Sequence, residues 1–414
     1  MKLQKKLFLF LIVIAFKNYS ESKDINVDLN LISFIKFSDG LGQIPISFIS
    51  TLHKDIHINF VNSREFWLWP ADLPVYITDI ISKTKKINEI KPKSISIYTD
   101  TLDVYSEEYL QKQNQIKFSY SLVEGTRVPV AWVERLNKHF DGVLVGDEYL
   151  VDVYKSSGVK IPIFVLPIAL NLDVFLKQEK RKSTNPIFTF GFSAGFGESK
   201  NHKLLVQAFC EEFAYEKNVV KLKLHGRQGH YYEEVKKCVE SYPNFNIELL
   251  YQTFSRQEYI EFLLSLDSYV ILSKGEGFSI TPRESLALGL PTIVSNNTCQ
   301  KTICNSGFVY SVKSDIKEPH ITVDQTTFGF DFNCEIKDAR RALREVYNNY
   351  EYYSELAQKG RHWANQYSIE SMRNKYLNLV KPKKIVFGKH NIISKNFFMT
   401  SSKELYKKYM ELYK

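Results

Sequence analysis

The chain has 414 residues, of which 44% are hydrophobic and 24% are charged, and its formal net charge is +9. This length and composition are typical of a soluble globular protein with two domains or more. The positive charge suits anionic partners, but the basic residues are spread along the chain and accompany no nucleic-acid-binding module, which argues against nucleic acid as a partner.

The N-terminus begins with a basic segment that runs into an apolar one. Lys2, Lys5 and Lys6 precede ten apolar residues, LFLFLIVIAF, at positions 7–16. Ten residues match the apolar core of a signal peptide and fall short of the roughly 20 that span a bilayer as a helix. Residues 1–22 are therefore predicted to be either a signal peptide or a shallow membrane anchor.

The first half of the chain, residues 23–176, alternates short apolar runs with helical patterns. Near-continuous apolar runs are typical of a parallel sheet that is covered on both faces. The predicted strands are 27–35, 56–61, 94–99, 116–121, 142–146 and 163–170. Helical patterns at 130–140 and 147–158 lie between them, so we predict a doubly wound α/β domain.

A polar linker at 177–185 separates this half from a second alternation over residues 186–370. Its predicted strands are 187–192, 219–226, 245–252, 267–273 and 291–295. Its predicted helices are 202–214, 233–242, 256–266, 283–289, 335–349 and 353–367. The predicted fold class is α/β, with two Rossmann-like doubly wound domains facing a cleft and a basic C-terminal tail at 371–414.

The stretch GEGFSITPRE, residues 275–284, places two carboxylates on either side of a turn. Thr281 and Glu284 have the spacing of a capping box, with proline at the first helical position. The turn follows a strand and feeds a helix N-terminus, which offers free N–H groups to a phosphate. Glu276 and Glu284 are then placed to reach hydroxyls on both sides of a diphosphate, as in a nucleotide sugar.

The text around this turn resembles the retaining glycosyltransferases of family 4, which have the GT-B fold. The matching segments are EGFSITPRESLALGLPTIVS and SKNHKLLVQAF in the second half, and YSLVEGTRVPVAWVERLNKHFDGVLV and SGVKIPIFVLPIALNLDVF in the first. The resemblance covers roughly residues 115–370. It implies transfer of a sugar from a nucleoside-diphosphate donor to a glycan or lipid-linked acceptor, with no cofactor.

The resemblance also implies roles for single residues. Glu276 matches the glutamate that contacts the donor sugar, and Glu284 matches the one that holds the ribose. The turn of Gly277, Phe278 and Ser279 matches the backbone that faces the sugar and the diphosphate. Lys200 matches a lysine that neutralises the diphosphate, a charge that stabilises the leaving group.

One expected basic residue is missing. The family usually has an arginine shortly before this lysine, but no basic residue lies between Gly191 and Ser199. Either Lys200 neutralises the diphosphate alone, or the missing arginine is replaced by Lys203, Arg227 or Arg283. The segment GFSAGFG also lacks the G-x-G-x-x-G spacing of a dinucleotide site, which excludes that interpretation.

Three residues of the first half are candidates for the other wall of the cleft. Gly42, in DGLGQ, either approaches donor or acceptor or belongs to a plain turn. Glu124 and Arg127 follow a predicted strand and either line the acceptor side or form a local ion pair.

The chain contains no Asp-x-Asp, the motif that holds the cation in metal-dependent sugar transfer on another fold, so no metal is expected. Two alternatives remain. A sugar- or nucleotide-binding module of the same fold is one. A glycoside hydrolase using Glu276 and Glu284 is the other, although a capping-box glutamate should have a lowered pKa, unlike a catalytic acid.

The expected location is the cytoplasm, where nucleotide sugars are normally made, with residues 1–22 either attaching the chain to a membrane or acting as a signal peptide. An anionic membrane surface is thus a further candidate partner. The five cysteines form no C-x-x-C pair, and an odd count argues against both a zinc site and a disulfide framework.

Overall fold

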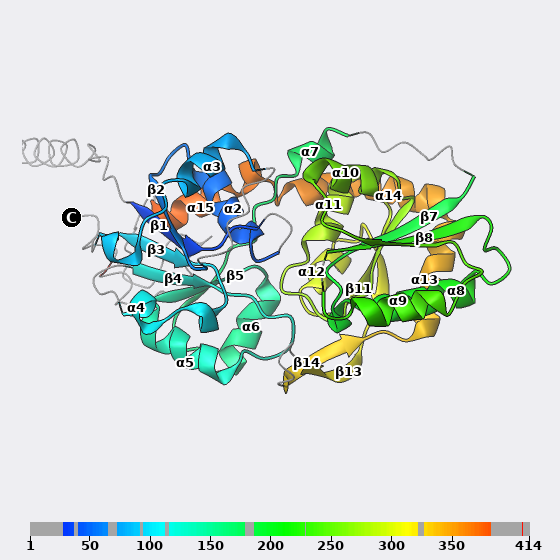
Figure 1. Cartoon of the computed structure of the whole chain (residues 1–414), viewed down its shortest axis with the longest axis horizontal. Coiled ribbons are helices and arrows are strands. Elements are labelled where there is room, and N and C mark those ends of the chain that lie inside the picture. The colour runs from blue at the N-terminus through cyan, green and yellow to red at the C-terminus, as the bar shows by residue number, and fades with distance from the viewer. Residues whose placement is uncertain are drawn as a thin grey trace, which may run out of the picture.

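The computed structural model describes residues 28–36, 40–64, 73–91, 94–111, 116–178, 186–227, 229–321 and 327–381, together with residue 408. The predicted N-terminal segment, most of the predicted linker and nearly all of the basic tail beyond 381 lie outside the described residues. Two α/β domains lie side by side (Figure 1).

The N-terminal domain is built on a six-stranded parallel sheet with strand order β2-β1-β3-β4-β5-β6. Its strands are β1 (Leu29–Ser33), β2 (Ile58–Asn62), β3 (Ile95–Tyr98), β4 (Ile116–Tyr120), β5 (Gly142–Val145) and β6 (Ile163–Val165). Its helices are α2 (Gln43–Leu52), α3 (Val75–Ile81), α4 (Glu107–Leu110), α5 (Val130–His139) and α6 (Glu148–Ser156). Every one of the six predicted strands in this half is present.

The C-terminal domain has a second six-stranded parallel sheet with strand order β12-β11-β10-β7-β8-β9. Its strands are β7 (Phe188–Ser193), β8 (Val220–Gly226), β9 (Ile247–Tyr251), β10 (Ser268–Ile271), β11 (Thr292–Asn296) and β12 (Tyr310–Lys313). The helices are α7 (Asp173–Leu176), α8 (His202–Glu212), α9 (Tyr232–Glu240), α10 (Arg256–Leu264), α11 (Ile280–Leu288), α12 (Gln300–Cys304), α13 (Ile336–Asn348) and α14 (Tyr350–Asn365). The strand order reverses between β7 and β10, so both strands end at the switch point where such sheets bind ligands.

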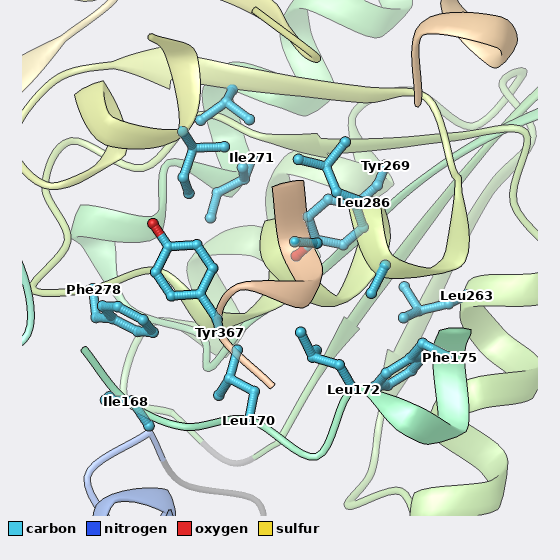
Figure 2. Close-up of a cluster of buried hydrophobic side chains, with 14 of the residues drawn as sticks. Ile168, Leu170, Leu172, Phe175, Leu263, Tyr269, Ile271, Phe278, Leu286 and Tyr367 are labelled. Atoms are coloured by element: carbon cyan, nitrogen blue, oxygen red, sulfur yellow. The ribbon is translucent and has the colours of Figure 1, made fainter. Parts of the chain in front are cut away.

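The chain crosses from the first domain to the second between β6 and α7. Its apolar residues, among them Ile168, Leu170 and Leu172, pack beside Phe278 and Tyr367 of the second half (Figure 2). Helix α7 contacts α11. The boundary between the domains therefore lies at about residue 170. Helix α7 belongs with the second domain rather than with residues 23–176.

A second crossing returns the chain to the first domain. Residues 371–380, predicted as the start of a tail, continue helix α15 (Ile369–Val380), which packs on α2 (Figure 1). The hydroxyl of Tyr376 lies 2.7 Å from Ser47 Oγ and accepts from Ala169 N at 3.1 Å. Met372, Tyr376 and Leu379 are buried, and their helical spacing is the signal that the sequence offered for this helix.

An unpredicted hairpin follows β12. Strands β13 (Ile316–Ile321) and β14 (Thr327–Asn333) pair antiparallel and reach the first domain (Figure 1). Thr126 N donates to the Phe330 carbonyl at 3.2 Å, and Phe330 N donates to Thr126 Oγ1 at 3.0 Å. The hairpin thus ties the loop after β4 to the C-terminal domain.

Candidate active site

A cavity of about 470 Å³ lies between the domains, at the carboxyl ends of the central strands. This volume is within the range of small-molecule sites. The first domain contributes Gly40, Leu41, Gln43, Leu122, Glu124 and Ile168 to its wall. The remaining wall comes from the loops after β7, β8, β9 and β10 and from the start of α11.

The turn after β10 passes close to the first domain because two of its residues are glycines. A Cβ on Gly275 would lie 2.4 Å from the Glu124 carbonyl oxygen, and one on Gly277 would lie 3.1 Å from Leu122 Cβ. A side chain at Gly275 would therefore push the two loops apart. Glycine is required at this position by the close approach of the backbones.

Ser279 ends the turn in a left-handed conformation, with φ 67°, and is the N-cap of α11. Such a φ is uncommon outside glycine and marks a constrained backbone. The Ser279 side chain is 6% exposed, lines the cavity and has no hydrogen-bond partner within the described chain. The N-terminus of α11 and an unpartnered hydroxyl therefore face the same space, an arrangement suited to an anion.

Lys200 is held between two carboxylates from different domains. Its Nζ donates to Glu276 Oε1 at 2.8 Å and to Glu124 Oε1 at 2.9 Å. Burial raises the pKa of Glu276, and the nearby charge of Glu124 raises it further. Lys200 lowers this pKa, but the net effect is an increase. Burial opposes the charge on Lys200, yet the two carboxylates together hold its pKa above the usual range. The cluster therefore carries one positive and two negative groups.

Glu284 does not form the predicted capping box. Because Ser279 starts the helix two residues before Thr281, Glu284 lies beyond the first turn and faces the cavity. Its carboxylate accepts a hydrogen bond from Tyr259 Oη at 2.9 Å. Burial raises its pKa despite the nearby Arg256 and the Tyr259 hydrogen bond. The sequence-based expectation of a lowered pKa for Glu284 was wrong. That expectation was the argument against a glycoside hydrolase, so the argument no longer holds.

The far end of the cavity is aromatic. His225, at the end of β8, stacks on Phe254 with ring centroids 3.7 Å apart and an interplanar angle of 5°. Its ring nitrogens lie 2.8 Å from Ser193 Oγ and 3.0 Å from the Gln252 carbonyl, and burial lowers its pKa to about 4. Sequence reasoning did not single out His225, Phe254 or Tyr259, although His225 lies at the end of one predicted strand and Phe254 just after another, which was a usable signal.

Residues 175–363 match the family described as glycosyl transferases group 1. The match covers most of the second domain. A search of curated protein sequences found no match.

Solved structures with the GT-B fold superpose on both domains. The first comparison is TarM, with TM-score 0.56 and 19% identity over 71% of this chain. The chain spans only 56% of the length of TarM. HepE from Anabaena, in complex with UDP and glucose, gives TM-score 0.63 and 9% identity over 86% of this chain and 100% of its own. Trehalose-6-phosphate synthase OtsA gives TM-score 0.65 and 10% identity, over 86% of this chain and 99% of its own. The fold of this chain is GT-B.

Seven of the nine residues singled out from the sequence line the cavity of this GT-B protein: Glu124, Lys200, Glu276, Gly277, Phe278, Ser279 and Glu284. Gly42 is not part of the lining, although Gly40, Leu41 and Gln43 are. A Cβ on Gly42 would lie 2.4 Å from the Lys36 carbonyl oxygen, so this glycine serves the local turn. Arg127 is exposed, lies under Gly329 of the hairpin and is also outside the lining.

Of the three basic residues proposed to replace the missing arginine, the second domain brings one to the cavity. Arg283 is fully buried, donates to the carbonyl oxygens of Phe278 and Ser279, and lies 3.9 Å from the Phe278 ring centroid. It shapes the turn from behind. Lys203 is exposed and lies over the Tyr231 ring at 5.7 Å. Arg227 lines the cavity.

Within the described ranges, no group of three His, Cys, Asp or Glu side chains is placed to hold a metal ion. Of the helices in those ranges, none is long and apolar enough to cross a membrane. All five cysteines are free thiols.

Proposed function

We propose that the protein is a retaining glycosyltransferase that moves a sugar from a nucleoside-diphosphate donor to a glycan or lipid-linked acceptor. One observation carries the proposal. Glu276 and Glu284 line a single cavity on either side of the α11 N-terminus, where an unpartnered buried hydroxyl and the helix dipole favour an anion.

In this proposal the donor lies across the N-terminus of α11. Glu276 accepts hydrogen bonds from sugar hydroxyls, and Glu284, braced by Tyr259, accepts from the ribose hydroxyls. The backbone of Gly277 to Ser279 and the Ser279 hydroxyl face the diphosphate. The base would lie near the stacked pair His225 and Phe254, on the same wall of the cavity as Glu284.

Transfer requires stabilisation of a leaving diphosphate and exclusion of water. The ammonium group of Lys200 and the helix N-terminus are preorganised positive groups that stabilise the departing anion. The transition state has oxocarbenium character, and retention follows when the acceptor attacks the face that the diphosphate leaves. Closure of the two domains around the cavity excludes water and favours transfer over hydrolysis.

The acceptor enters from the N-terminal side, past Glu124. This carboxylate is 41% exposed and is the one charged group of the described first domain in the cavity wall. The solved relatives support the ligand classes only as precedents: HepE was crystallised with UDP and glucose, and TarM from S. aureus with UDP, fondaparinux and α-GlcNAc-glycerol. Because both of these complexes contain UDP, UDP is the first nucleotide to test.

A second candidate is a binding module of the same fold without turnover. Two carboxylates already occupy Lys200, and no basic residue lies between Gly191 and Ser199, which favours this alternative. Binding of donor in the presence of acceptor without any product would identify it.

The test measures nucleotide binding first and transfer second. Thermal unfolding of the full chain with UDP, GDP, ADP and CDP should show stabilisation by one of them, about 2.7 kcal/mol at 100 times Kd. Glu284→Ala should reduce this stabilisation, whereas Tyr352→Phe, at an exposed position, should not. Product anomers followed by NMR then decide retention, and activity that persists in EDTA supports transfer without a metal. No stabilisation by any nucleotide would contradict the proposal.

The location of the protein stays a prediction. Residues 1–22 lie outside the described residues, and the choice between a signal peptide and an attachment to a membrane surface rests on their sequence alone. Cell fractionation of the full chain, with N-terminal sequencing, distinguishes the two.

A further inference from the structure

The charges in the cavity wall do not match those of a diphosphate. Its described lining contains three carboxylates, Glu124, Glu276 and Glu284, against two basic side chains, Lys200 and Arg227. His225 also lines the cavity, but its pKa of about 4 keeps it neutral at pH 7. The lining therefore has a formal charge of −1 before a ligand with two or more negative charges enters.

Lys200 alone cannot balance that ligand. Its ammonium group already donates to Glu276 at 2.8 Å and to Glu124 at 2.9 Å, and its side chain is 18% exposed. A diphosphate that approaches Lys200 also approaches both carboxylates. A second cation on a different element is needed to make the site attractive to the anion.

Arg227 follows the strand next to the segment Gly191–Ser199, in which no basic residue lies. Strands β7 and β8 are parallel neighbours, with Ser193 opposite His225. The next residues are also in close contact, because a Cβ on Gly226 would lie 2.4 Å from the Ala194 carbonyl oxygen. Gly195 and Arg227 come next in the chain, just beyond the ends of the two strands, and both line the cavity.

The space in front of Gly195 is open. A Cβ built on Gly195 would have no heavy atom within 4 Å, apart from the glycine itself and its chain neighbours. The absent side chain at this position therefore leaves room at the cavity wall. A long side chain from the adjacent strand can occupy that room.

We propose that Arg227 is the second diphosphate-binding cation of this site, reaching from β8 into the space left by Gly195. The inference rests on the proposed function. A guanidinium group suits this task because its planar donors bind two phosphate oxygens at once and its charge does not titrate. Lys200 and Arg227 then hold the diphosphate from two neighbouring strands.

The test separates the phosphate contribution from the nucleoside contribution. Isothermal titration of the full chain with a nucleoside and its mono- and diphosphate, for the base that the wild type binds, gives the gain in affinity due to each phosphate. Arg227→Gln should weaken diphosphate binding about 10- to 100-fold, the effect of losing a charge-assisted hydrogen-bonded pair, and leave the nucleoside unchanged. Arg227→Lys should restore part of the loss.

A compensating variant makes the test specific for the location. Adding Gly195→Arg to Arg227→Gln should recover at least tenfold of the lost diphosphate affinity, because the new side chain enters the open space from the adjacent strand. Lys203→Gln is the matched control, since it removes an exposed positive charge nearby without touching the cavity.

The outcomes distinguish this inference from the function on which it rests. Wild-type diphosphate binding that depends on Glu284 but not on Arg227 overturns the inference and leaves the proposed function standing. Equal weakening of nucleoside and diphosphate by Arg227→Gln also overturns it, because the residue then supports the base or the fold. Failure of the wild type to bind any nucleoside diphosphate overturns both.

Discussion

The carboxylate of Glu284 illustrates the conflict between stability and function in a binding site. It is half-buried with one hydrogen bond, from Tyr259, and desolvation raises its folded pKa. A carboxyl group with a raised folded pKa favours folding below its unfolded pKa of about 4.3, and this contribution is lost as the pH rises through the folded value. At neutral pH the empty protein therefore holds an unfavourable, partly desolvated charge.

We expect Glu284→Gln to stabilise the empty protein at pH 7.5 by about 1 kcal/mol, while nucleotide binding weakens. The gain in stability should disappear near pH 4, where the wild-type carboxyl is protonated in both states. Thermal unfolding of both proteins at the two pH values checks this. A destabilised variant at pH 7.5 would show that the carboxylate is well paired in the folded state.

Lys200 and its two partners should respond unequally to substitution. Lys200→Met leaves the buried Glu276 without its cation, which we expect to cost about 3 kcal/mol of unfolding free energy. Glu124→Gln removes a partner that is 41% exposed, so we expect less than about 1 kcal/mol. Urea unfolding at pH 7.5 measures both, and equal losses would contradict the assignment of Glu276 as the main partner.

The hairpin of β13 and β14 holds the element that carries Glu124. It bonds to Thr126 through Phe330, while the backbone of Glu124 lies close to Gly275. The loop after β4 is therefore held by two neighbouring parts of the C-terminal domain, the hairpin and the turn after β10. We expect these contacts to determine whether Glu124 reaches Lys200.

Gly275→Ala should separate the two loops, because its Cβ would lie 2.4 Å from the Glu124 carbonyl oxygen. The expected result is a loss of 2 kcal/mol or more, by the usual scale for a forced backbone shift, about 1–3 kcal/mol, together with a large loss of transfer activity. Gly197→Ala is the control, since its nearest atom is Lys200 Cγ at 4.0 Å. Unchanged activity in Gly275→Ala would show that the contact is dispensable.

The hairpin should also show a pH-dependent stability. His320 is buried against Asp331, 2.7 Å away. Burial alone lowers the pKa of His320, but the hydrogen bond and charge of Asp331 outweigh it, aided by Glu124 and opposed by Lys200, so its pKa is raised. A histidine with a raised folded pKa stabilises fully below about pH 6.5, and this contribution is lost as pH rises through the folded value.

We expect His320→Gln to destabilise the protein more at pH 6 than at pH 9, with a difference of about 1 kcal/mol. Denaturant unfolding at the two pH values measures it. His362→Gln, on α14 and away from the cavity lining, is the control. A loss that does not depend on pH would mean that the histidine is neutral in the folded protein.

At this scale the sequence predicted some elements and not others for physical reasons. Buried parallel strands are near-continuous apolar runs and stand out, as in FTFGFS and DSYVILS. The hairpin does not, because IKEPHI mixes charge and proline with apolar residues and pairs with only one strand. The predicted capping box failed because an αL serine began the helix earlier, a backbone state that composition does not encode.

The site was predicted to a similar extent. Glu276 and Glu284 were found through residue types around a turn, and Lys200 through the resemblance of its segment to a known family, and both are local features of the sequence. The contact between Glu124 and Lys200 joins residues 76 positions apart in different domains, so it depends on how the domains meet. Arg227 was one of three candidates, and only the cavity lining separates it from Lys203 and Arg283, which lie outside that lining.

At the scale of the whole molecule, α15 makes the end of the described chain part of the first domain. Tyr376 bonds with Ser47 and accepts from Ala169 N, and both are distant in sequence. We expect Tyr376→Phe to cost about 1–2 kcal/mol, since the hydroxyl satisfies buried groups. Tyr352→Phe, 60% exposed on α14, should cost nothing measurable. Hydrogen exchange in α2 should increase in the first variant and stay unchanged in the second.

The two crossings between the domains are bonded to each other. Leu170 N donates to the Tyr367 carbonyl at 2.8 Å, and Ile369 N donates to the Leu170 carbonyl at 3.1 Å. Leu170 and Ser368 thereby form a parallel bridge, so the two crossings lie side by side at one junction between the domains. Separation of the two domains about this junction would break two further contacts, the Thr126–Phe330 hydrogen bonds and the Glu124–Lys200 ion pair. Under the proposed function, a donor diphosphate that draws Lys200 away from Glu124 breaks the ion pair beside the sugar, while the hairpin still holds the loop after β4.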